Sequence, residues 1–456
     1  MSFTTDSSCW PDVWLAATAR GTTICGDFLA ATALALALQG AGAGGLAVSG
    51  LLLAATLPLV VLAPLTGRLV DRVDSRTLLV TVGLAQAVIC TLLAVAEHPV
   101  LVVGLVALLA CGLAVTQPCL AALLPAMVRP ADLPRASAIS QNAVSLGALG
   151  GPALAGLLVG QFGTRVPLLL DAVTYLALVV AGLLLRTRRG GRRPAAAGPA
   201  GGGSPANQAN PSGTEVRWRL RRDPLMLVMV VSTAVVIAAI GGINVIEVFF
   251  IRETLHGSAT TYGLVGAVWM AGMLPGSWIA ARLARRFDHD GAFIHGVLVT
   301  LAMCSLLVLL AATVPTAGLL VPLWLVAGAA NGGENVFANL LTSRRVPEPM
   351  RGRAYASYGA AVQGGSMAGY LVGGALLTVV PPRPLIAGAG AAGLLVVLAF
   401  VPVVARAVRR PVPRAEGTDA GLATPGRPAE PDPKAGDTVG SWLSASHDRG
   451  SGTSSS

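Results

Sequence analysis

The sequence predicts an all-α polytopic membrane protein, with twelve transmembrane helices in two six-helix halves and both termini in the cytoplasm. Three observations lead to this fold class: an apolar composition, a series of apolar stretches of membrane-spanning length, and an asymmetric distribution of arginine. Of the 456 residues, 54% are hydrophobic and only 12% are charged, whereas soluble proteins carry about 25% charge. So few charges cannot cover a soluble surface, and the composition therefore excludes a soluble globular protein.

The apolar stretches define the expected helices. A helix needs roughly 20 apolar residues to cross the hydrocarbon core of a bilayer. The spans are expected at residues 13–39, 46–66, 77–96, 100–122, 138–161, 166–185, 225–250, 262–281, 292–314, 319–341, 354–380 and 385–405. The N-terminal sequence MSFTTDSSCWPD has no basic run, so it is not expected to be a signal peptide.

The arginines set the orientation of these spans. With both termini inside, 28 of the 32 basic residues fall on the cytoplasmic side, three fall outside, and Arg20 lies within the first span. Basic residues accumulate in cytoplasmic loops, and the reverse orientation would invert the pattern. The net charge of +10 is therefore ascribed to topology and anionic lipid rather than to nucleic acid, since no basic patch is interleaved with aromatic residues.

Two polar segments divide the chain. Residues 187–222 are rich in Arg at their ends and in Gly, Pro and Ala between them, and residues 407–456 are rich in Pro, Gly and Ser. Neither can bury enough apolar surface to offset the entropy of ordering. We therefore expect an N-terminal half over 1–186, a flexible cytoplasmic linker over 187–222, a C-terminal half over 223–406 and a disordered cytoplasmic tail over 407–456.

The two halves repeat each other. RLVDRVD, from Arg68, matches RLARRFD, from Arg282, at an offset of 214 residues, and both follow the second span of their half. RPADLPRA, from Arg129, similarly matches VPEPMRGRA, from Val346, and both follow the fourth span. Two matches at nearly one offset, each in the equivalent loop, indicate a duplication.

Two motifs resemble those of a known superfamily. GRLVDRVDSRTLL, residues 67–79, carries five charges in an expected cytoplasmic loop and resembles the loop signature of the major facilitator superfamily. GALGGPALAG, residues 147–156, resembles the Gly-Pro motif of its proton-coupled exporters. GD at 26–27, LLLDAVTYL at 168–176 and RGRAYAS at 351–357 resemble the macrolide-efflux and enterobactin-exporter branch, which consists of drug:proton antiporters. The sequence departs from these motifs at Asp74 and Ala155, where Gly is usual.

The resemblance covers residues 13–406 and implies two six-span halves around a central midplane site. It implies that the charged loop acts as a latch, contacting the start of the eleventh span when the transporter faces outward. The latch residues are Gly67, Asp71, Arg72, Arg76, Gly352 and Arg353. Gly67 is expected to allow a tight turn, and Asp71 to be stabilised by a facing helix N-terminus. The alternative is that the arginines only hold the loop inside. For Gly147, Gly151, Pro152 and Gly156 the resemblance implies a role against leakage, beside ordinary close packing.

Acidic residues inside the expected spans are the next candidates for functional residues. A charged Asp at the centre of a membrane helix costs roughly 2.5–3.5 kcal/mol on insertion scales, so such residues normally face a cavity or a partner. Asp27 lies near the middle of the first span, with Arg20 seven residues earlier on the same face. Proton coupling, a structural polar contact and direct substrate contact remain open for Asp27. Asp171 lies near the outer end of its span and could simply be in water.

A polar stripe follows the tenth span. Asn331, Asn335 and Asn339 recur every four residues and share a helix face, and Glu334 lies beside them as a second proton-coupling candidate. These side chains either line a cavity or bond to neighbouring helices. The same alternatives hold for the other cavity candidates, which are Arg20, Gln117, Gln141, Asn244 and Glu247.

The leading function is export of small amphipathic molecules in exchange for protons. The alternatives are an importer or facilitator of the same fold and a non-transporting membrane sensor. An enzyme is not expected, since no phosphate loop, HExxH pair or nucleophile elbow is present. No cofactor is expected, and the six scattered cysteines indicate neither a metal site nor a disulfide framework.

The expected partners are a small-molecule substrate, protons and the lipid bilayer. Acids outnumber Arg20 inside the spans, which favours neutral or cationic cargo, and antibiotics or siderophores are plausible by analogy. A monomer in the plasma membrane is expected. The bias toward Arg, Ala and Gly is typical of a GC-rich bacterial genome and points to a bacterial inner membrane.

Overall fold

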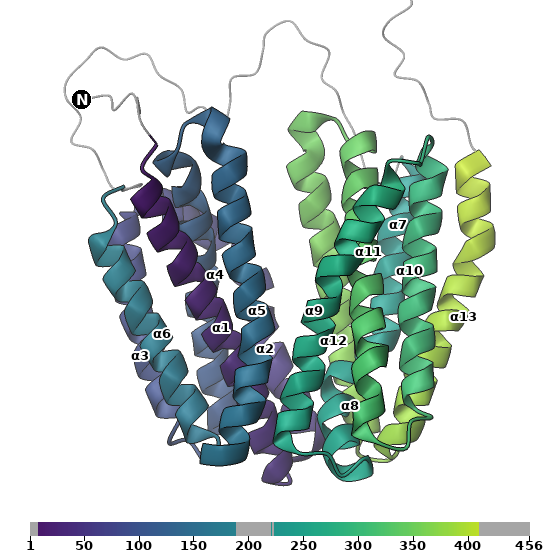
Figure 1. Ribbon diagram of the computed structural model, residues 1–456, viewed down its shortest axis with the longest axis horizontal. Helices are drawn as coiled ribbons and strands as arrows, with labels where there is room; N and C mark the ends of the chain where they lie inside the picture. The colour runs from purple at the N-terminus through teal and green to yellow at the C-terminus, as the bar shows by residue number, and fades with distance from the viewer. Residues whose placement is uncertain (1–7, 188–219, 221–222, 410–456) are drawn as a thin grey trace, which may run out of the picture. The chain divides into compact units, whose positions relative to one another are not determined.

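The computed structural model describes residues 8–187, 220 and 223–409, which are helical with short connections and contain no strand (Figure 1). The expected linker and tail lie almost entirely outside these residues. The first half contains α1 (Trp10–Gly40), α2 (Gly44–Arg72), α3 (Ser75–Leu93), α4 (Pro99–Met127), η1 (Pro130–Asp132), α5 (Leu133–Phe162) and α6 (Arg165–Leu184). The second contains α7 (Pro224–Ile240), α8 (Ile243–Phe249), η4 (Phe250–Thr254), α9 (Ala259–Ala284), α10 (Asp290–Ala311), η5 (Ala317–Leu319), α11 (Leu320–Arg345), η6 (Glu348–Met350), α12 (Arg351–Leu376) and α13 (Pro382–Arg409).

Ten candidate membrane spans are long and apolar enough to cross a bilayer within the part of the chain that the structure describes. The tenth and eleventh of the twelve expected spans form the long helices α11 and α12 but are not among the ten. Their composition explains this, because α11 carries three Asn and Glu334, and α12 contains two Arg and many Gly and Ser. The count of twelve membrane helices is therefore still a prediction for these two.

The expected seventh span, 225–250, is broken rather than continuous. α7 ends at Ile240, α8 begins at Ile243, and a π-helical turn extends the span to Thr254. At the break, Gly241 and Gly242 lie against α12, where a Cβ on Gly242 would stand only 3.0 Å from the carbonyl oxygen of Gly369. Two adjacent glycines weaken a helix and here allow α12 to approach the backbone closely.

Residues 67–79 are mostly helix, so the prediction of a loop there is wrong. α2 continues to Arg72, α3 begins at Ser75, and only Val73 and Asp74 lie between them. The tight turn therefore falls at Val73 and Asp74, and Gly67 lies inside α2. The amphipathic end of a membrane helix can project beyond the apolar core, which hydropathy alone does not reveal.

The helices pack in the same way in both halves. In the first half, α1 contacts α5 and α6, α2 contacts α4, and α3 contacts α4 and α6. In the second, α7 contacts α12 and α13, α9 contacts α11, and α10 contacts α11 and α13. A short 3₁₀ turn precedes both α5 and α12. The internal repeat seen in the sequence is thus matched by a repeat of helix pairings.

Contacts between the halves gather at one end of the bundle. We call the end where α6 finishes and α7 begins the linker end (upper in Figure 1), and the opposite end the far end. The halves meet where α5 packs on α9 and α2 packs on α12. Ser49 Oγ donates to the carbonyl oxygen of Tyr370 (2.6 Å), and Thr260 Oγ1 donates to that of Gly156 (3.2 Å). All four residues lie in the far-end parts of their helices.

At the linker end, ion pairs tie the second half together internally. Arg345, the last residue of α11, bonds to Asp223 at 2.9 Å and to Asp290 at 3.0 Å. Asp223 also caps α7 by accepting a hydrogen bond from the backbone N–H of Met226 at 3.2 Å. The network therefore ties the ends of α7, α10 and α11 together at the linker end.

Replacing Gly156 by Val is expected to separate the halves at the far end. A Cβ on Gly156 would lie 2.7 Å from the carbonyl oxygen of Ala259 and 2.9 Å from the Cα of Gly263, both on α9. Overpacking typically costs 1–3 kcal/mol, so the closed far end should lose population by about fivefold to hundredfold. Spin labels at the exposed positions Gln161 and Thr316 measure the change.

Gly104→Val is the matched control, because a Cβ on Gly104 meets nothing within 4 Å. It should leave the distance distribution of the wild-type chain in place. An unchanged distribution in Gly156→Val would show that this contact does not set the far-end spacing.

Candidate functional site

Asp27 lies midway along α1 and bonds to α6. Tyr175 Oη donates a hydrogen bond of 2.5 Å to Asp27 Oδ1. The Asp27 side chain is half-buried, whereas Tyr175 is fully buried. No Arg or Lys forms an ion pair with Asp27 among the described residues. Asp27 is therefore an intramembrane acid held by one neutral donor.

Arg20 does not neutralise Asp27. Its guanidinium donates to Ser140 Oγ on α5 at 3.3 Å, while its buried Nε has no hydrogen-bond partner. Although Arg20 and Asp27 share a helix face, the structure shows no direct contact between their side chains among the described residues. Arg20 instead joins α1 to α5, on the linker-end side of Asp27.

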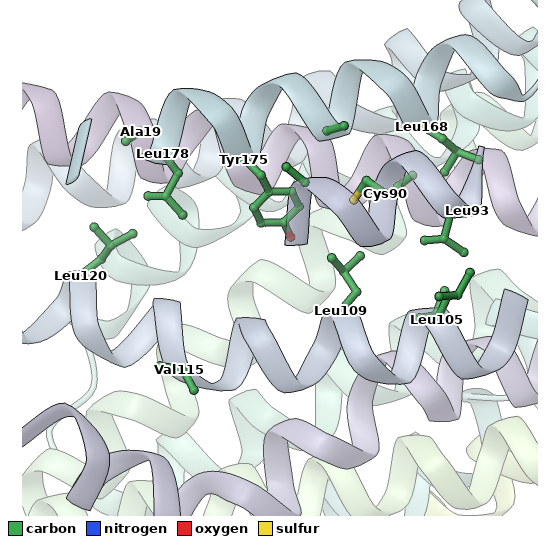
Figure 2. Packing of buried hydrophobic residues seen from close by; sticks show 14 of the residues in the cluster. Ala19, Cys90, Leu93, Leu105, Leu109, Val115, Leu120, Leu168, Tyr175 and Leu178 are labelled. Atoms are coloured by element: carbon green, nitrogen blue, oxygen red, sulfur yellow. The ribbon is translucent and has the colours of Figure 1, made fainter. Parts of the chain in front are cut away.

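Asp171 is completely buried, so the interpretation that it lies in water is wrong. It accepts hydrogen bonds from Cys90 Sγ (3.2 Å) on α3 and from Thr174 Oγ1 (3.1 Å) on its own helix. Figure 2 shows Cys90 and Tyr175 among the buried leucines of this region. The length of the span placed Asp171 near a membrane surface, but the packing of α3 and α1 on α6 covers it.

Glu334 is held in the second half much as Asp27 is held in the first. Its side chain is 2% exposed, and Tyr358 Oη, on α12, donates to Glu334 Oε1 at 2.6 Å. Like Asp27, it has no ion-pair partner in the part of the chain that the structure describes. Glu334 therefore points into the packing between α11 and α12.

Glu247 has a third arrangement of the same kind. Trp324 Nε1, on α11, donates to Glu247 Oε1, on α8, at 2.8 Å. The neighbouring candidate Asn244 is exposed, and its side-chain amide bonds back to the carbonyl oxygen of Gly241 at 3.1 Å. Glu247 thus ties α8 to α11, whereas Asn244 closes the helix break.

Three intramembrane acids therefore share one chemistry. Within the described residues, each accepts a single hydrogen bond from a neutral aromatic side chain and forms no ion pair. A neutral donor holds a carboxylate without compensating its full charge. Low dielectric penalises an uncompensated charge. Such an acid is suited to binding and releasing a proton. Tyr175, Tyr358 and Trp324 were not singled out from the sequence, because each lies on a different helix from its acid.

The contacts of the remaining cavity candidates do not show that these residues line a common cavity. Asn331 and Asn335 are half-buried, and Asn335 Nδ2 donates to the carbonyl oxygen of Asn331 at 2.9 Å. Asn339 and Gln141 are exposed, and Gln117 is half-buried. A pocket of about 210 Å³ at the far ends of α1, α3, α4 and α6 contains none of them.

The Gly-Pro motif divides between two neighbours. Gly147 and Gly151 lie against the backbone of α1, where a Cβ on Gly151 would stand 2.7 Å from the carbonyl oxygen of Cys25. Pro152 and Gly156 instead face Gly263 on α9, in the other half. The motif therefore packs its own half and also forms part of the far-end contact between the halves.

Among the latch residues whose side chains the structure describes, no polar contact joins the loop to the start of α12. Arg72 is exposed and Arg76 half-buried, and neither forms a hydrogen bond or ion pair with Gly352 or Arg353, which begin α12. The guanidinium of Arg353 makes a long contact of 4.0 Å with Met350 Sδ. The side chain of Asp71 and the surroundings of Gly67 lie outside the described residues.

No group of His, Cys, Asp and Glu in the described ranges has an arrangement that could hold a metal ion. The free cysteines in these ranges likewise form no disulfide.

Comparison with known proteins assigns the family. A family model described as transmembrane secretion effector matches residues 7–419, whereas no curated protein gives a significant sequence match. The nucleoside transporter NupG has a similar structure, with a TM-score of 0.69 and 13% identity over 86% of this chain and 99% of that one.

Two other solved structures are similar. A bacterial homologue of the iron transporter ferroportin in an inward-facing state has a TM-score of 0.65 and 15% identity, over 89% of this chain and 100% of that one. A D-xylose–proton symporter has a TM-score of 0.62 and 16% identity, over 86% and 97%. The TM-scores show a shared fold, and at these low identities they show the fold alone. Together with the family match, they show that this multi-pass membrane protein belongs to the transmembrane secretion effector family and is a transporter of the major facilitator superfamily.

Proposed function

We propose that the chain is a secondary active exporter of small amphipathic molecules, which it exchanges for protons by alternating access. The observation that carries the proposal is the pair formed by Asp27 and Tyr175, an acid midway along α1 with a neutral donor and no counter-ion. One charge that crosses 100 mV is worth ~2.3 kcal/mol and 1.4 kcal/mol corresponds to tenfold, so a single proton can drive a gradient between about tenfold and hundredfold. Glu334, with its bond to Tyr358, is the second proton-coupling candidate.

The proposed topology places both termini and the linker in the cytoplasm, with halves at 1–186 and 223–406. In that orientation the far end faces outward, and the contacts of α5 with α9 and of α2 with α12 close the outer side. The structure would then be an inward-facing state. Within the described residues, Arg72 and Arg76 form no hydrogen bond or ion pair with Gly352 or Arg353, which agrees with this state, since the latch is proposed to form only when the transporter faces outward.

The cargo is proposed to be neutral or cationic, of the drug, antibiotic or siderophore class. Asp27, Glu247 and Glu334 outnumber Arg20 among the charged groups inside the helices. The similar structures do not select a substrate, because their names cover nucleoside, iron and sugar transport. Resemblance to the macrolide-efflux and enterobactin-exporter branch supports export, and a monomer in a bacterial inner membrane is the proposed setting.

Cysteine labelling tests the topology. In a variant without native cysteines, Ser212→Cys and Ser444→Cys should react only with reagents applied from the cytoplasmic side. Gly42→Cys and Thr316→Cys should react only from outside. The reason is the 28-to-3 division of basic residues. External labelling at Ser212→Cys would refute the six-plus-six arrangement.

Asp27→Asn is expected to abolish proton-driven efflux while the protein stays in the membrane. The amide keeps the shape of the side chain and a hydrogen bond with Tyr175 but cannot release a proton, so a tenfold to hundredfold gradient should collapse. Accumulation of a panel of antibiotics, with and without a protonophore, measures it. Glu97→Gln is the control, because the Glu97 side chain is 88% exposed and should tolerate the change. Efflux by Asp27→Asn with the pH dependence of the wild-type chain would remove Asp27 from the proton pathway.

Asp71→Asn tests the latch. The loss of ~1–2 kcal/mol of helix-end interaction should shift the outward-to-inward ratio toward inward by roughly fivefold to thirtyfold and slow turnover. Topology and abundance should stay normal. Arg68→Ala and Arg76→Ala should each do less, since many arginines hold the same topology. Spin-label distances across the linker end, read with transport rates, decide the matter. If both are unchanged in Asp71→Asn, the charges serve only as a topological anchor.

A further inference from the structure

A second acid lies beside the proposed proton-coupling residue. Asp171 and Tyr175 are four residues apart on α6, so they share one face of that helix. Tyr175 bonds to Asp27 from this face. One face of α6 therefore presents two groups toward α1: the carboxyl of Asp171 and the Tyr175 hydroxyl that bonds to Asp27.

The backbone of α1 brings the two acids close. Gly26 precedes Asp27, and a Cβ at Gly26 would overlap Asp171 Oδ1 and lie 2.5 Å from Thr174 Oγ1. Only glycine leaves room for the Asp171 carboxyl at this point of contact. Asp171 thus packs directly against the residue next to Asp27.

In the part of the chain that the structure describes, no positively charged group is recorded against Asp171. The ionisable groups that face it are Cys25 and Asp27 on α1, Cys90 on α3 and Tyr175 on α6. α5 also contacts α6, and its one ionisable residue, Arg135, lies over the ring of Trp10 at the linker end. Arg20 is seven residues from Asp27, about 10 Å along the axis, and bonds to Ser140.

Two neighbouring carboxylates that lack a cation disfavour simultaneous ionisation, because their repulsion is weakly screened in low dielectric. Asp171 is fully buried, whereas Asp27 is half-buried. Asp27 therefore keeps some accessible surface, which Asp171 lacks. Asp27 is suited to exchanging protons with its surroundings, and Asp171 to influencing that exchange by its charge.

We propose that Asp27 and Asp171 form one proton-binding pair across α1 and α6, in which a single proton is shared in the loaded state and released from Asp27. This inference rests on the proposed proton antiport and names the residue that acts with Asp27. The proton balance is simple: the pair gains one proton and one unit of positive charge on loading, and loses both on release. No other bond forms or breaks.

Infrared difference spectroscopy of the purified protein over a pH series tests the pair, because protonated carboxyl groups absorb at a different frequency from ionised ones. In Asp171→Asn the protonation of Asp27 should move to lower pH by about one unit or more, a tenfold change in proton affinity, since the neighbouring negative charge is gone. In Asp27→Asn the band of Asp171 should move in the same direction, as reciprocal coupling requires.

Two controls separate coupling from structure. Cys90→Ala removes a hydrogen bond to Asp171 but keeps both acids, so the coupled titration should persist. Glu247→Gln removes another intramembrane acid outside the pair and should leave the bands of Asp27 and Asp171 in place. If Asp171→Asn does not fold, the shift of the Asp171 band in Asp27→Asn still decides the question.

The failures of the two proposals can be told apart. The pair would be overturned if Asp27 titrates at the same pH in Asp171→Asn as in the wild-type chain, and Asp171 at the same pH in Asp27→Asn. That conclusion would hold even where Asp27→Asn abolishes pH-dependent efflux. Coupled titrations in a chain whose efflux does not depend on a proton gradient would keep the pair and refute proton antiport. If Glu247→Gln shifts the titration of the Asp27 and Asp171 bands by an equal amount, the shift reflects a general rearrangement, and the pair is overturned.

Discussion

Close approach of helix backbones at glycine is the interaction on which this bundle depends. Lipid tails are as apolar as leucine, so burying apolar side chains drives helix association only weakly in a membrane, and van der Waals packing takes its place. Gly276 lies against the backbone of Ala329, and Gly328 against that of Trp269, which joins α9 to α11. Wherever such a glycine carries a side chain, the two helices must separate.

The same close packing determines where polar groups can lie. Helices that touch along their backbones leave little room for water, so an acid in the interior needs a donor from a neighbouring helix. Asp27, Glu247 and Glu334 each have one such donor, an aromatic ring that also fills space. An aromatic donor suits this position, since its ring packs with the apolar side chains while its N–H or O–H serves the carboxylate.

The packing within each half differs from the packing between the halves in its extent along the helices. Within each half, glycine contacts and buried hydrogen bonds run along much of the helices, whereas the contacts between halves lie toward the far end. Gly147 and Gly156 illustrate the difference, because they lie on one helix and face α1 and α9, respectively. A protein built in this way can change the spacing of its halves at the linker end without unpacking either half.

The sequence by itself determined the all-helical class, the approximate course of each long helix and the internal repeat. These depend on hydropathy along the chain and on the spacing of matching segments, both of which are given by the order of the residues without any tertiary contact. Only the tertiary structure decided which side chains meet. Tyr175 lies 148 residues from Asp27, and Asp171 lies 81 residues from Cys90. Burial and pairing depend on how each helix is rotated against its neighbours, and for that reason Asp171 is enclosed although its place in the span suggested water. Gly147 and Gly156 lie nine residues apart on one helix, so helix periodicity alone places them on opposite faces, and the tertiary structure decided that these faces meet α1 and α9.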